Sequence, residues 1–136
     1  MIPVMQETAV AFEAKTSASF AETVERCRQA LGKEGFGVLT EIDVQATLKK
    51  KLDVDREPYL ILGACHPPSA HRALTAAPEV GVLLPCNVCV SVEGGQTVVR
   101  AMNPESAMSL LKSPAVEEVA REVAAALRRV VQAAAA

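Results

Sequence analysis

Hydrophobic and polar residues alternate in several short segments, and this pattern predicts strands. In residues 8–14, Val10 and Phe12 point to one side and Glu13 points to the other, which is typical of a half-buried strand. Residues 59–64 form a nearly continuous apolar run, which indicates a buried strand. Further strands are expected at residues 36–42, 82–92 and 97–102.

The fourth of these strands, residues 82–92, contains a proline and leads into a turn. Pro85 has no backbone N–H to donate to a neighbouring strand, so it places this strand at a sheet edge or at a bulge. The Glu-Gly-Gly-Gln sequence at residues 93–96 predicts a tight hairpin turn. The strand at residues 97–102 is then the returning arm of that hairpin.

Apolar residues recur every three or four positions in other segments, and this spacing predicts helices. The first helix begins after Ser19, which forms a capping box with Glu22, and ends near Gly35, which suits a left-handed C-terminal position. The last begins with Ser113 as N-cap and Pro114 in its first turn. Its apolar stripe is long, and the tail after it is expected to fray. The other helices are expected at residues 43–52, 67–77 and 104–111, the last one at 114–132, and the frayed tail at 133–136.

Strands and helices together predict a single α+β domain spanning residues 1–136. This length is usual for one domain, and the chain shows no internal repeat or linker that would divide it. A chain of this size buries roughly two thirds of its unfolded surface, so one core can hold it together without disulfides.

Composition and charge argue against two classes of partner. The net charge is −2, and the only basic run is at residues 49–51. With three Phe, one Tyr and no Trp, the chain lacks the basic footprint and stacking aromatics of nucleic-acid binding. No run approaches the ~20 apolar residues of a membrane span, and residues 1–6 do not resemble a secretion leader. We therefore expect a cytoplasmic protein with no nucleic-acid or membrane partner.

Three separated motifs resemble the domain of unknown function 302 family. They lie in order at residues 36–51, 59–74 and 82–88, and the resemblance covers about residues 8–111, with the helix at 114–132 beyond it. It implies a curved antiparallel sheet with helices on one face, similar to the TATA-binding-protein-like class. It implies no activity, because the family is named for lacking one.

The same resemblance singles out two cysteines. The paired cysteines of the family correspond to Cys65 and Cys86, whereas Cys89 stands where the family has an aliphatic residue. The chain also departs from the family at His66, where Asn is usual.

The residues around Cys65 form the candidate site. Cys65 ends a predicted strand just before a helix that begins with two prolines, and the positive end of the helix dipole favours a thiolate there. His66 is a candidate ligand, base or surface residue. Cys86 and the adjacent Asn87 complete the set. The alternative is that Cys65 simply packs at a tight junction, because free cysteine is among the most buried residue types.

The Cys-x-x-Cys spacing of Cys86 and Cys89 is not by itself evidence of a metal or redox pair. On a strand, residues three apart face opposite sides, so only a bulge would bring these sulfurs together. Cys27 lies on the apolar stripe of the first helix and is expected in the core. The carboxylates near the lysine run are interpreted as solvated loop and cap residues, namely Asp43, Asp53 and Asp55.

Two functions remain open from the sequence. The first is a binding or accessory module for a small molecule or partner segment, without catalytic activity. The second is a thiol site in which Cys65 and Cys86 bind a soft metal such as Cu(I) or cycle as a dithiol. No cofactor follows from any motif. A chain that is half hydrophobic, with a striped last helix, also predicts a homodimer or small oligomer.

Overall fold

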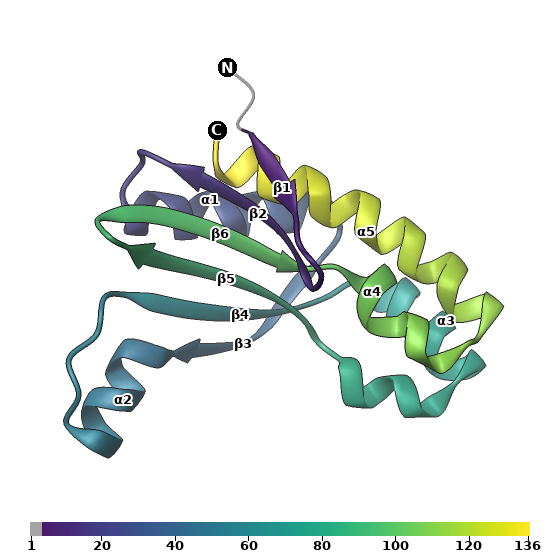
Figure 1. Cartoon of the computed structure of the whole chain (residues 1–136). Coiled ribbons are helices and arrows are strands. Elements are labelled where there is room, and N and C mark those ends of the chain that lie inside the picture. The colour runs from purple at the N-terminus through teal and green to yellow at the C-terminus, as the bar shows by residue number, and fades with distance from the viewer. Residues whose placement is uncertain (1–3) are drawn as a thin grey trace.

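The computed structural model describes residues 4–136, which form one six-stranded antiparallel sheet with helices packed on it (Figure 1). Of the segment examined for a leader, residues 1–3 lie outside this range. The order of strands across the sheet is β1-β2-β6-β5-β4-β3. Their bounds are β1 (Met5–Glu7), β2 (Ala11–Thr16), β3 (Gly37–Asp43), β4 (Tyr59–Cys65), β5 (Cys86–Glu93) and β6 (Gln96–Met102). The expected single α+β domain with an antiparallel sheet is confirmed.

The two longest helices provide nearly half of the buried core residues. α1 (Phe20–Lys33) and α5 (Pro114–Ala134) contact each other and the sheet. Alternate residues of the central strands point toward these helices and are fully buried, as the period of two requires. These buried strand residues are Phe12, Leu62, Ala64, Val88, Val90, Val99 and Ala101. Cys27 is fully buried among them, which confirms its predicted place in the core.

The shorter helices lie at the two ends of the sheet. α2 (Val44–Leu52) lies at one end, whereas α3 (Pro67–Ala76) and α4 (Pro104–Met108) lie at the other (Figure 1). Short 3-10 helices, η1 (Pro78–Leu83) and η2 (Ser109–Leu111), follow α3 and α4.

The predicted helix ends are confirmed by their capping contacts. Ser19 accepts a hydrogen bond from the Glu22 N–H, Asp43 from Ala46, and Ser113 from Val116. Each contact satisfies one of the backbone donors that a helix leaves unpaired at its start. Gly35 has a φ of +82°, so the left-handed position expected after α1 is present.

The prediction for Pro85 was wrong. Residues 78–83 are helical, β5 begins only at Cys86, and β5 lies between β4 and β6 inside the sheet. Pro85 therefore stands just before a central strand, where it removes no ladder hydrogen bond. The bond between Leu84 and Pro85 is cis. The register shift of this sheet is instead in β3, between Val38 and Thr40.

Both ends of the described chain also differ from expectation. Val10 precedes β2 and is exposed, because Thr8 Oγ1 accepts hydrogen bonds from the Val10 and Ala11 N–H groups and turns the chain there. A short strand, β1, that the sequence analysis did not predict pairs with β2. At the other end α5 extends to Ala134, and Ala134 is fully buried, so the tail is packed rather than frayed.

None of the helices formed by residues 4–136 combines the length and apolar character that a membrane span needs.

Candidate functional site

An apolar pocket opens where β4 ends and β5 begins. Its volume is about 280 Å³, and its walls come from α3, α5 and the segments flanking both strands. Three of the four predicted site residues, Cys65, His66 and Cys86, line it. The other lining residues are Phe36, Leu39, Ala64, Ser69, Ala70, Ala73, Leu74, Leu84, Pro85, Met108, Val119, Ala120 and Val123.

Small side chains leave this space open. Ala64 lies at the sheet side of the pocket, Ala70 and Ala73 on α3, and Ala120 on α5. Protein interiors are usually filled to the density of organic crystals, so four alanines around one space leave a void that larger side chains would close. The pocket is therefore a consequence of residue size as well as of backbone shape.

Gly63 brings Pro85 close to β4. A Cβ at Gly63 would lie 2.9 Å from Pro85 Cγ and nearer still to Thr40 Oγ1. Any other residue at this position would push the segment before β5 away from the sheet. The absence of a side chain at Gly63 thus permits the close approach of Pro85, the residue before Cys86.

Cys65 and Cys86 lie on neighbouring strands at the pocket. Cys86 pairs with Ala64, the residue before Cys65, and Cys65 pairs with Gly37 of β3. Cys86 is buried and Cys65 is half-buried. Burial, and to a lesser extent the nearby Cys65, raise the pKa of Cys86 to about 11, so Cys86 is a neutral thiol at pH 7.

His66 is held in place from two sides. It is the N-cap of α3, and its Nδ1 lies 2.7 Å from the Oγ of the buried Ser69 in the first turn. Its ring packs against Phe36 with centroids 5.4 Å apart, and a Cβ at Gly35 would come within 3.2 Å of Cδ2. The imidazole is therefore oriented by the first turn of α3 and the end of α1, and not by Cys65.

Asn87, the fourth predicted site residue, does not join the others. It is exposed, pairs with Gly63 in the ladder, and does not line the pocket. The reason is the alternation of strand side chains, since Cys86 points to the pocket side and its neighbour points away.

Cys89 is separate from Cys86, as the strand geometry predicts. It pairs with Ile61 and Arg100, three residues along β5 from Cys86. Burial raises the pKa of Cys89, and a hydrogen bond with Tyr59 partly opposes that change. Within residues 4–136, no three or more His, Cys, Asp or Glu side chains gather as a metal site would need.

The carboxylates beside the lysine run are solvated, as expected. Asp53 and Asp55 are exposed and form ion pairs with Lys49 at 2.9 and 3.0 Å. Asp43 caps α2. None of the three lines the pocket.

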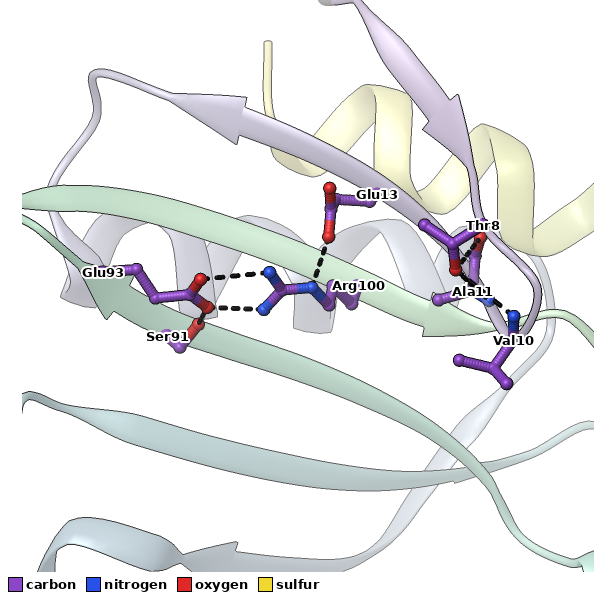
Figure 2. A network of polar contacts seen from close by, with 7 residues as sticks. All are labelled: Thr8, Val10, Ala11, Glu13, Ser91, Glu93 and Arg100. Atoms are coloured by element: carbon purple, nitrogen blue, oxygen red, sulfur yellow. Dashed lines mark hydrogen bonds and ion pairs between the residues drawn. The ribbon is translucent and has the colours of Figure 1, made fainter.

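A polar network that the sequence analysis did not predict joins three strands (Figure 2). Arg100 on β6 donates from Nε to Glu13 on β2 at 2.5 Å, and from both terminal nitrogens to Glu93 on β5 at 2.5 and 3.0 Å. Ser91 donates to the same Glu93 carboxylate at 2.7 Å. Hydrogen bonds from Arg100, and then Ser91, lower the pKa of Glu93 to about 2. The network ties strands together and lies away from the pocket.

A larger hollow is less suited to a specific ligand. It has a volume of about 780 Å³ and lies beside β1, β2, the start of α1 and the end of α5. Its walls carry charges of both signs, among them Glu13, Lys15, Glu22 and Arg26. Small-molecule sites are mostly apolar with a few converging polar groups, and the 280 Å³ pocket fits that description better.

Several pocket residues were not recognised as site residues from the sequence. Val119 and Val123 belong to the apolar stripe of α5, and a stripe residue that lines a cavity has the same pattern as one that packs in the core. Leu39 lies at the β3 bulge, where the alternation is interrupted. In the sequence, the small side chains of Ala70 and Ala73 on α3 could have indicated a pocket wall.

Comparison with known proteins places this fold in a family. Residues 12–134 match the family described as "Domain of unknown function DUF302". The match includes α5, so the expectation that the last helix lies beyond the family resemblance was wrong. No curated protein matches the chain. The crystal structure of an uncharacterized conserved DUF302 protein from Bacillus stearothermophilus is similar, with 32% sequence identity and a TM-score of 0.84. The similarity covers 89% of this chain and 94% of that one. The chain therefore belongs to the DUF302 family, as the three sequence motifs predicted.

Proposed function

We propose that this protein is a binding module that holds a small, mainly apolar molecule in the pocket beside Cys65, His66 and Cys86. The observation that carries the proposal is a pocket of about 280 Å³ whose walls are almost wholly apolar side chains, with the two thiols and one imidazole in them. Small-molecule pockets start at roughly 300 Å³, and engineered apolar cavities of about 150 Å³ bind benzene. A ligand with one or two rings, or a short branched chain, fits this space.

Binding is favoured over catalysis by the state of the polar groups. Burial keeps Cys86 as a neutral thiol at pH 7, and His66 Nδ1 is engaged with Ser69. These groups are suited to orienting a ligand through one or two polar contacts. The cysteines fit a reducing cytoplasm, which is where we propose that the protein acts.

Indole is a suitable probe because it is mainly apolar, aromatic and small. We expect indole to shift the methyl NMR signals of Leu84 and Val123, with saturable binding. Ala70→Leu should weaken binding at least tenfold by filling the pocket. Ala76→Leu, on the exposed side of the same helix, is the matched control and should leave binding unchanged. Absence of saturable shifts in the native protein, or equal binding by Ala70→Leu, would contradict the proposal.

A second candidate is a thiol site at the same pocket. It is supported by the two cysteines lining one pocket on adjacent strands and by the influence of Cys65 on Cys86. Two thiolates suit a soft ion such as Cu(I), and binding would have to displace the Cys86 proton. As a redox pair, the two thiols would give one disulfide, with two electrons and two protons passing to hydrogen peroxide, which becomes two molecules of water.

Copper and thiol measurements separate this candidate from the first. Competition with a coloured Cu(I) chelator should show one ion bound per chain, and Cys65→Ser or Cys86→Ser should each abolish it. Cys89→Ser is the matched control, because Cys89 is also half-buried but lies elsewhere on β5. Equal copper binding by all three variants would exclude the site. Indole binding by Cys65→Ser would leave the first proposal standing.

A further inference from the structure

One edge of the molecule exposes large apolar side chains. Leu39 and Ile42 on β3 are 66% and 49% exposed, and Leu52 and Val54 at the end of α2 are 67% and 43% exposed. α2 buries none of its own residues, and it lies at the end of the sheet away from α3 and α4 (Figure 1). Single exposed apolar residues are ordinary, but four along one edge strand and the end of the helix that follows it are unusual.

One side of the edge strand β3 has no neighbouring strand among residues 4–136. β3 is the last strand in the sheet order and pairs with β4 on one side. It is seven residues long, whereas β1 at the opposite edge has three. An exposed edge strand can pair with another chain, and natural proteins limit such pairing by covering, shortening, bulging or charging the edge. The register shift near Leu39 leaves residues 40–43 as the regular part of this edge.

We propose that the surface formed by β3, α2 and Val54 is the interface of a homodimer, and that a second copy of this chain covers it. A two-fold axis beside β3 sets the two β3 strands antiparallel. The Leu39 end of each copy then meets the α2 end of the other, where Ile42, Leu52 and Val54 are exposed. The apolar residues at one end of this surface thus contact the apolar residues at its other end in the second copy, as an isologous dimer requires.

Charge on this surface favours a second copy over a partner of one sign. α2 ends in three lysines, of which Lys49 is held by Asp53 and Asp55, whereas Lys50 and Lys51 are exposed. β3 carries Glu41, which pairs with Arg28 and is still 45% exposed. The two-fold arrangement brings the lysines of each α2 toward the Glu41 of the other copy. A surface that carries charges of both signs can therefore pair with a second copy of itself.

The interface would also affect the pocket. Leu39 lines the pocket and is exposed, so it stands at the pocket's open side. The α2 end of the second copy would cover that opening. The dimer itself does not rest on the proposed ligand, since the exposed edge is there whether or not the pocket is occupied.

Light scattering coupled to gel filtration tests the interface at about 100 μM, where weak pairs remain associated. We expect a mass of twice 14.4 kDa for the native chain and of one chain for Leu52→Glu and Ile42→Glu. Leu110→Glu is the matched control: Leu110 is 83% exposed on η2, outside this surface, and its variant should stay dimeric. Circular dichroism melts confirm that each variant is folded.

Zero-length coupling of amines to carboxylates identifies the contact. In a mixture of ¹⁴N- and ¹⁵N-labelled chains, we expect amide links between Lys50 or Lys51 of one copy and Glu41 of the other. A monomeric native chain, a dimeric Leu52→Glu variant, or cross-links between copies through another face would each overturn the proposal. If the Leu52→Glu variant is monomeric and still binds indole, the pocket works without the interface, so the two proposals can fail independently.

Discussion

The four cysteines differ chiefly in how far water can reach them. Cys27 is fully buried between α1 and the sheet, Cys86 is buried in the pocket wall, and Cys65 and Cys89 are half-buried. Burial raises the pKa of Cys27 to about 12, so its thiol stays neutral even in mildly alkaline solution. Since the thiolate is the reactive form, exposure and charge state together separate these otherwise similar side chains.

Cys27→Ala should destabilise the fold without affecting the pocket. Removing the sulfur leaves a small cavity, which should lower the free energy of unfolding by about 1–2 kcal/mol. Urea unfolding followed by circular dichroism measures this change, and indole binding should stay as in the native protein. Native Cys27 should also resist a thiol reagent at pH 8 that modifies Cys65. Weakened binding at unchanged stability would assign Cys27 to the site and contradict its structural role.

The approach of Pro85 to β4 depends on one glycine, and this makes a second prediction. Gly63→Ala would place a methyl group against the Pro85 ring and Thr40 Oγ1, and we expect it to lower the free energy of unfolding by about 1–3 kcal/mol. Indole binding should weaken as well, because the segment that carries Cys86 must move.

Gly32→Ala is the control for this substitution. Gly32 lies inside α1 with nothing within 4 Å of the added Cβ, so the same change should stabilise the helix by up to about 1 kcal/mol. Chemical denaturation of both variants gives the comparison. Equal stability of Gly63→Ala and the native protein would mean that the space between β4 and Pro85 is larger than described.

Helices and strands with strong local signals were predictable from sequence. The capped starts at Ser19, Asp43 and Ser113 are determined by neighbouring residues, and each was found where expected. β1 was missed because three residues carry too little periodicity, and its pairing with β2 is made by the fold. The break before Cys86 was missed because residues 82–84 are as apolar as the strand that follows.

The candidate site was predictable only in part. Cys65, His66 and Cys86 were selected from motifs, and the structure places them on one pocket. Asn87 was included because it adjoins Cys86 in sequence, although strand alternation sends it to the other face. The pocket wall on α5 could not be predicted, because it depends on how a helix more than 30 residues later in the chain packs against α3.

The stability of the sheet should depend on pH, because Arg100 on β6 forms ion pairs with Glu13 on β2 and Glu93 on β5. The pKa of Glu93 is about 2 in the folded protein, against an ordinary 4.5. A carboxylate with a lowered pKa stabilises the fold above pH 4.5, and this contribution is lost as the pH falls toward 2. Glu93 is about half exposed, so screening by water should keep the contribution to no more than about 1 kcal/mol.

Glu93→Gln isolates this contribution. We expect the variant to be less stable than the native protein at pH 6.5, and we expect this difference to fall to about a quarter of its value at pH 2.5. Thermal or urea unfolding at the two pH values measures the difference. A stability gap that stays constant between these pH values would show that the Glu93 charge is not what Arg100 recognises in the sheet.

The place of β2 in the sheet has a consequence for how the protein is made. Ala11 pairs with Met102, so the first long strand finds its neighbour only after roughly 90 further residues have been added. At about 5–20 residues per second, the ribosome needs roughly 5–20 s to supply them. During that interval the apolar side of β2, including Phe12, has neither β6 nor α5 to cover it. The leading end of the nascent chain therefore carries an uncovered apolar strand for several seconds, and the sheet can close only when synthesis is nearly complete.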